Sequence, residues 1–91
     1  MPGEFFDTIG TIQLSLGRDR EAEESFTKGL RKAPEHPVLN YHMGKLIASD
    51  RNRSGRASSY LQKALAGKGR LTPTMVADAT ALLEGSMLLQ K

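Results

Sequence analysis

The sequence predicts an all-α fold of about five helices that pack as antiparallel hairpins. Three observations predict it. Apolar residues recur every three to four positions along several segments, which is the spacing of one face of an α-helix. A corner with two prolines separates two of these segments. A pattern of small and large residues also repeats after 34 positions, which is typical of stacked repeat units.

The corner within residues 22–44 is the best-defined part of the chain. The segment before it carries one apolar helix face, formed by Ala22, Phe26, Gly29, Leu30 and Ala33. Asp19 precedes that face and is predicted to cap the helix by accepting hydrogen bonds from its first amides. Pro34 should end the helix because its ring disfavours the helical conformation for the residue before it. Pro37 can open the next helix, where no amide hydrogen is needed.

The same signals predict the elements in order along the chain. Helices are expected at residues 4–16, 20–33, 37–49 and about 55–66, with a polar turn at residues 50–54. Residues 67–73 contain two glycines and a proline and are predicted to form a loop. Thr72 should cap a last helix over residues 73–89, which Pro73 opens.

Two glycines define the repeat. Gly10 and Gly44 lie 34 positions apart, each within a predicted helix. After one extra turn residue, the second half also matches the small–large–small pattern of the first half, with Ala57, Leu61 and Ala64 corresponding to Ala22, Phe26 and Gly29. Antiparallel helices approach closely only where side chains are small, so we expect these glycines and alanines at helix contacts. A single hairpin cannot bury its apolar face alone, so neighbouring hairpins must stack.

In these residues the chain resembles the tetratricopeptide repeat family, whose unit is a helix–turn–helix of 34 residues. The matching residues are Gly10, Ala22, Phe26, Gly29 and Pro34 in repeat one, at about residues 3–36, and Gly44, Ala57, Leu61 and Ala64 in repeat two, at about residues 37–70. Phe6 occupies the family's aromatic position, where the second repeat has Asn40. The resemblance implies a single domain over residues 1–91, a right-handed α-α superhelix, and a capping helix at about residues 73–90.

The resemblance also implies a concave groove that binds a peptide or a partner protein. Its lining carries over to Asp7, Thr11, Leu14, Tyr41, Lys45 and Ala48. Some family members hold a C-terminal carboxylate with a lysine–asparagine clamp, but Asp7 and Thr11 stand at those two positions, and an acid would repel a carboxylate. Tyr41 and Lys45, one turn apart, form the best candidate pair for gripping a peptide. The alternative is that both are ordinary surface residues.

Both ends of the chain carry apolar residues that one small domain does not require. Phe5, Ile12 and Leu16 form a second stripe on the first helix, and Leu88 and Leu89 make the last helix more apolar than a solvent-facing cap. A removed upstream repeat, a contact with another chain, or the wide apolar face of a small domain would each explain the stripe. Helical patterning begins almost at once, which favours a fragment of a longer array over a short natural protein.

Two classes of function follow from these features. One is a non-enzymatic scaffolding module that binds a peptide or partner protein in the groove. The other is an architectural end segment of a longer repeat array, or a homodimer, that associates through the apolar terminal helices.

Composition removes several other classes. The chain has 91 residues, a net charge of +3 and no cysteine, so neither a disulfide nor a thiolate metal site is available. No apolar run approaches the ~20 residues of a membrane span, and the N-terminus lacks the order of a signal peptide. His36 and His42 do not share a helix face, so we expect no metal, cofactor or catalytic site. The compartment stays open with the cytoplasm favoured, and the N-Y-x-x-G run after the corner is bacterial in style.

Positive charge is concentrated after the corner. Residues 37–72 carry seven basic residues and a single acidic one, Asp50. Six of the basic residues cluster in the turn and helix that follow: Arg51, Arg53, Arg56, Lys63, Lys68 and Arg70. No recognition helix or interleaved aromatic residues accompany them, which disfavours nucleic acid as a partner. We expect a solvated surface here, with the rim of a protein-binding site as the alternative.

Overall fold

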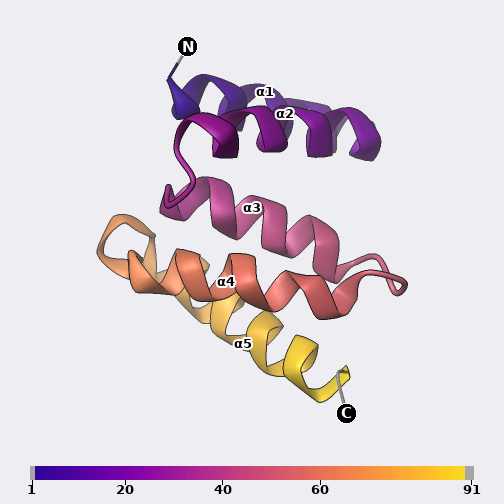
Figure 1. Ribbon diagram of the computed structural model, residues 1–91, viewed down its shortest axis with the longest axis vertical. Helices are drawn as coiled ribbons and strands as arrows, with labels where there is room; N and C mark the ends of the chain where they lie inside the picture. The colour runs from indigo at the N-terminus through magenta and orange to yellow at the C-terminus, as the bar shows by residue number, and fades with distance from the viewer. Residues whose placement is uncertain (1, 90–91) are drawn as a thin grey trace.

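The computed structural model describes the backbone of residues 2–89 and the side chains of residues 2–86. Apart from its connecting turns and loops, this part of the chain is helical and contains no strand, which confirms the all-α prediction (Figure 1). The five α-helices are α1 (Gly3–Ser15), α2 (Asp19–Lys32), α3 (Pro37–Ala48), α4 (Ala57–Ala66) and α5 (Pro73–Leu89). Two short 3-10 helices, η1 (Ser54–Arg56) and η2 (Lys68–Arg70), precede and follow α4.

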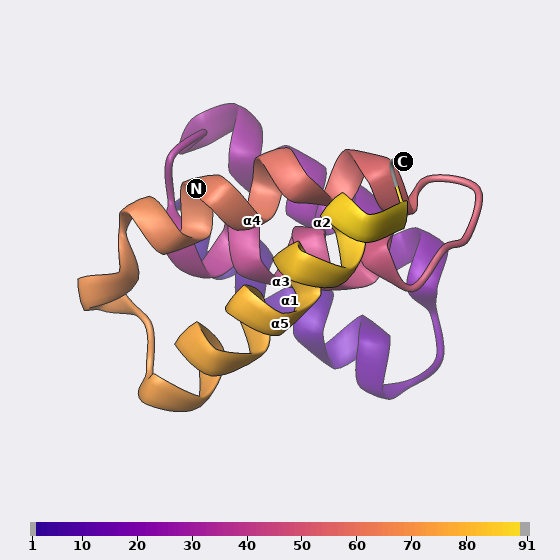
Figure 2. The same ribbon diagram turned by 90° about the horizontal axis from the view of Figure 1, so that it is seen from below.

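The helices pack as two hairpins and a final helix. Helix α1 lies along α2, and α3 lies along α4, while α5 packs on α4 and α3 (Figures 1 and 2). The two hairpins meet where α2 contacts α3, and α1 also contacts α3 directly. Helices α1, α3 and α5 therefore contact one another in succession, and α3 is covered from both sides. The described chain measures 38 × 29 × 22 Å along its principal axes.

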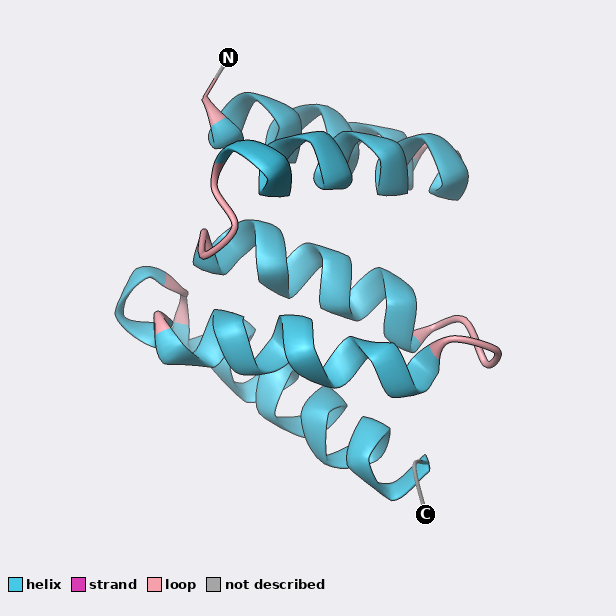
Figure 3. Ribbon diagram, viewed as in Figure 1, coloured by secondary structure: helices cyan, strands magenta, loops and turns pink. Residues whose placement is uncertain are grey.

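The proline corner between α2 and α3 forms as predicted (Figure 3). Ala33 leaves the helical conformation with φ −140° and ψ 76°, as expected for a residue before proline. Pro37 is the first residue of α3, and the ring of His36 accepts a hydrogen bond from the Leu39 amide at 3.3 Å. Asn40 locks the corner, because its side-chain amide donates to the carbonyls of Pro34 at 2.9 Å and His36 at 3.0 Å. This bonding accounts for a polar residue at the position that corresponds to Phe6 in the 34-residue repeat.

The predicted cap at Asp19 is wrong. Asp19 is already the first residue of α2, the cap position belongs to Arg18, and no side chain bonds the first amides there. The reason is the tight turn at Gly17, whose φ of +77° brings the chain back early enough for the helix to begin one residue sooner. Asp19 and Glu21 instead place negative charge in the first turn, where the helix dipole favours it.

The later boundaries follow the prediction with small changes. Helix α4 begins at Ala57 because the preceding three residues form a 3-10 turn, and the predicted loop after it contains η2. Thr72 does cap α5, since its hydroxyl accepts a hydrogen bond from the Met75 amide at 3.1 Å.

The core is built where glycine allows two helices to touch. A Cβ atom placed on Gly10 would lie 2.4 Å from the ring of Phe26, and one on Gly44 would lie 2.7 Å from Leu61. Phe26 and Leu61 have no exposed surface. Phe26 also stacks on the His42 ring, with centroids 5.8 Å apart, so it links the first hairpin to the second. Gly10 and Gly44 thus each allow a large side chain of the paired helix to pack against the backbone, as the 34-residue spacing predicts.

Candidate functional site

Three large apolar side chains are exposed along α1 and at its C-terminal end. Phe5, Ile12 and Leu16 are 41%, 53% and 61% exposed, and they are the exposed large hydrophobic residues among the described side chains. Their spacing of seven and four places them on one helix face. We call these three residues the α1 stripe.

The repeat shows what would normally cover such a stripe. Leu39 lies 34 positions after Phe5 and has no exposed surface, while Leu46 lies 34 positions after Ile12 and packs partly buried against the core. Leu39 is covered by the first hairpin: Cβ atoms on Gly3 and Gly29 would lie 3.1 and 2.9 Å from it. Helix α3 therefore carries a hairpin on the face that α1 leaves open.

Tyr41 and Lys45 lie beside each other as predicted, but they do not form an open grip. The Tyr41 side chain is buried, with 6% of the residue exposed, and its hydroxyl donates to Asp78 of α5 at 2.6 Å. The Lys45 ammonium lies 3.1 Å from the same carboxylate and 5.8 Å from the centre of the Tyr41 ring. Helix α5 packs against α3 and supplies one carboxylate to both residues, so a peptide would have to compete with Asp78 for them.

The three groups perturb one another's protonation. The hydrogen bond from Tyr41 lowers the pKa of Asp78, and the bond from Lys45 adds to this effect. The bond to Asp78 raises the pKa of Lys45. Burial raises the pKa of Tyr41, and its bond to Asp78 acts in the same direction. The cluster is therefore an ionised carboxylate held by a neutral phenol and a lysine cation at neutral pH.

The remaining predicted groove residues also serve the fold. Asp7 is half-buried and bonds the Nδ1 atom of His42 at 2.6 Å, which ties α1 to α3. Thr11 is half-buried and its hydroxyl donates to the Thr8 carbonyl at 3.0 Å. Leu14 and Ala48 are partly buried against the core.

The residues that sequence reasoning missed are the partners, Asp78 and His42. Asp78 carried one signal: it lies three residues after Met75, on the apolar face of the predicted last helix. His42 carried none beyond its place on a predicted helix, because its partner Asp7 is 35 residues away.

Arg53, one of the six residues of the predicted basic surface, is paired with two carboxylates. Arg53 binds both carboxylate oxygens of Glu23, at 2.7 and 2.8 Å, and its Nε donates to Asp50 at 2.9 Å. The bond to Arg53 lowers the pKa of Glu23 and is also the main cause of the lowered pKa of Asp50. Arg53 therefore holds the turn after α3 against α2. The basic surface has fewer unpaired positive charges than the number of basic residues suggests.

Several predictions concern other features. Leu88 and Leu89 lie at the end of α5, but their side chains are outside the described residues. Among the described residues, no group of three or more histidine and acidic side chains could hold a metal ion. None of the described helices is long and apolar enough to cross a membrane. Comparison with protein-family models, with curated proteins and with solved structures finds no match for this chain.

Proposed function

We propose that this chain is a non-enzymatic protein-binding module built from tetratricopeptide-like hairpins in a right-handed superhelix, and that its partner covers the α1 stripe. The partner we expect is another helical hairpin, seated on α1 as the first hairpin is seated on α3. The nearest source of such a hairpin is a second copy of the chain or a neighbouring repeat unit.

The observation that carries the proposal is the contrast between matched positions. Phe5 is 41% exposed, whereas Leu39 has no exposed surface, although both residues stand five positions before the glycine that lets the two helices of their hairpin touch. Burying apolar surface contributes about 25 cal/mol per Å². Covering the α1 stripe with a second hairpin would therefore contribute favourably to the free energy of association.

The concave side is the weaker candidate for the binding surface. A peptide that used Tyr41 would have to displace the Asp78 carboxylate and leave a buried hydroxyl without its acceptor, which costs about 1–3 kcal/mol. Lys45, whose side chain is 57% exposed, remains accessible to a partner. Lys45→Glu is thus the substitution that reports on groove binding.

Light scattering during size-exclusion chromatography tests the proposal over a range of about 10–500 μM protein. The mass should rise with concentration toward that of a dimer. Phe5→Asp together with Ile12→Asp should abolish the rise, because two charges would be buried at the contact. Ala66→Asp with Ala77→Asp adds the same charge at exposed positions elsewhere and should leave the association unchanged.

Three outcomes would count against a second copy of the chain seated on the α1 stripe. The first is a wild-type mass that stays monomeric throughout, which removes the second copy as the partner. The second is an equal effect of the two double variants, which would indicate an effect of charge rather than of the stripe. The third is a loss of association with Lys45→Glu alone, which would move the contact to the groove.

A further inference from the structure

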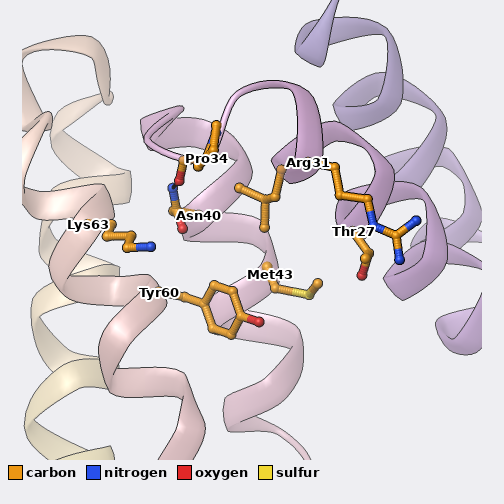
Figure 4. Close-up of a pocket in the computed structure, with 8 residues that line it drawn as sticks. Thr27, Arg31, Pro34, Asn40, Met43, Tyr60 and Lys63 are labelled. Atoms are coloured by element: carbon orange, nitrogen blue, oxygen red, sulfur yellow. Dashed lines mark hydrogen bonds between the residues drawn. The ribbon is translucent and has the colours of Figure 1, made fainter.

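A hollow of about 250 Å³ lies between α2, α3 and α4, away from the α1 stripe (Figure 4). Three helices and the proline corner contribute to it. It is lined by Thr27, Leu30, Arg31, Pro34, Asn40, Met43, Tyr60 and Lys63. Nothing in the proposed function uses this surface, so it raises a separate question of what it holds.

The hollow combines an apolar floor with a charged rim. Leu30, Met43 and Tyr60 supply the apolar surface, and Met43 is buried while the other two are half-buried. Figure 4 shows the Lys63 side chain extending from α4 toward the hollow, with Arg31 on α2 at the opposite edge and its guanidinium directed away from Lys63. Both cations are exposed.

The two cations are free to bind an outside group. Among the described residues, neither Arg31 nor Lys63 takes part in an ion pair or a side-chain hydrogen bond. Arg53, by contrast, is held by two carboxylates. The polar wall is already satisfied, because the Asn40 amide donates to Pro34 and His36. The hollow therefore offers two unpaired positive charges around an apolar base.

We infer that this hollow binds an acidic segment of a partner protein, in which one large apolar side chain enters the hollow between flanking carboxylates. The volume suits a single side chain, since it is below the ~300–1,000 Å³ of sites that enclose drug-sized ligands. The charge is complementary, since Arg31 and Lys63 stand on opposite sides and would each meet a carboxylate. Arg31 can hold its carboxylate through two parallel hydrogen bonds.

Fluorescence anisotropy with a defined peptide tests this inference. The probe is fluorescein-Gly-Ser-Glu-Glu-Leu-Glu-Glu-Ser-Gly-amide, titrated with the full chain at low salt. We expect saturable binding with a dissociation constant below about 1 mM. The affinity should fall as salt is added, because salt screens the charges at the rim. The same peptide with alanine in place of leucine should bind at least about fivefold more weakly if the floor receives the side chain.

Charge reversal on the protein provides the matched comparison. Arg31→Glu with Lys63→Glu should weaken binding by more than about tenfold. Lys32→Glu with Lys68→Glu makes the same change in net charge at exposed positions outside the hollow and should change binding by less than about threefold. All four side chains are exposed, so each variant should remain folded, and circular dichroism checks this.

The inference is overturned by any of three results. One is the absence of saturable binding up to about 1 mM. Another is equal weakening by the two double variants, which would mean that the peptide follows net charge alone. The third is equal affinity for the leucine and alanine peptides, which would leave the floor without a role. None of these results affects the α1 stripe, whose test uses no peptide.

Discussion

Gly10→Ala tests the close approach of α1 and α2 on which the first hairpin depends. The new methyl carbon would lie 2.4 Å from Cε1 of Phe26, and 2.7 and 2.8 Å from two further ring carbons. Ordinary carbon–carbon contact is about 3.5–4.0 Å. The ring would therefore have to withdraw by more than about 1 Å. It has little room, because Phe26 has no exposed surface and stacks on His42.

The magnitude follows from two opposing effects. Overpacking a well-filled core costs about 1–3 kcal/mol. Alanine is a better helix former than glycine by about 1 kcal/mol, which offsets part of that cost. Because the new contact would be as short as 2.4 Å, we expect the upper part of the overpacking range, about 2–3 kcal/mol, so that Gly10→Ala lowers the free energy of unfolding by about 1–2 kcal/mol net. For a domain of this size that corresponds to a fall in Tm of about 5–10 °C.

Gly85→Ala in α5 is the matched control. Apart from its chain neighbours and the nearby backbone of α5, no atom of the described residues lies within 4 Å of the position where its Cβ would stand, so we expect only the gain in helix propensity. This substitution should raise the free energy of unfolding by about 0.5–1 kcal/mol. Urea unfolding followed by circular dichroism at 222 nm measures both variants against the wild type.

A double variant identifies the clashing partner. With Phe26→Leu in place, the smaller side chain leaves space, so Gly10→Ala should cost less there than in the wild type. The reasoning is refuted if Gly10→Ala matches or exceeds the stability of the wild type. It is also refuted if the cost of Gly10→Ala is unchanged by Phe26→Leu, because the ring would then not be what the methyl group meets.

Three further predictions concern the polar contacts. Because the pKa of Asp78 is lowered in the folded chain, the stability that Asp78 contributes is present above its ordinary pKa of 3.8 and is lost as pH falls through its folded pKa. Asp78→Asn should remove this part of the pH dependence, as measured by urea titrations between neutral and acid pH. Arg53→Met and Glu23→Gln should each destabilise, and a double-mutant cycle should give a favourable coupling energy that shrinks at high salt. A coupling of zero would mean that the pair is only a surface contact. Asn40→Asp keeps the side-chain shape but removes both donated hydrogen bonds at a residue that is 1% exposed. It should lower the free energy of unfolding by about 3 kcal/mol or more, as measured by thermal unfolding. A loss below about 1 kcal/mol would contradict the role of Asn40 in the corner.

Much of the fold could be predicted because its signals are local or steric. Helix faces follow from spacing along the chain, and prolines restrict their neighbours whatever surrounds them. The pairing of Gly10 with Phe26 and of Gly44 with Leu61 was predictable in kind, since a missing side chain must be filled by a large one. The cap at Asp19 failed because its position depended on how tightly the chain turns at Gly17.

The site was predicted only in part, and the difference has a physical origin. The exposure of the α1 stripe follows from having more apolar faces on one helix than one hairpin can cover. The engagement of Tyr41 and Lys45 by Asp78 does not follow from spacing, since these residues are separated by more than 30 positions. A shift of one residue turns a helix by about 100° and moves it about 1.5 Å along its axis. Such a shift would remove the contact while leaving every local pattern intact.

By itself, the sequence determined that this chain forms helices, where the corner bends, and which small residues allow helices to touch, because each of these depends on neighbours within a few turns or on the lack of a side chain. Only the tertiary structure decided which charges meet, that Asp78 of α5 bonds both Tyr41 and Lys45, and that Arg31 and Lys63 lie at opposite edges of one apolar hollow. Those outcomes depend on the rotation and offset of one helix against another. The rotation and offset depend on many packing contacts between residues that are distant in the sequence, so they cannot be predicted from any single segment.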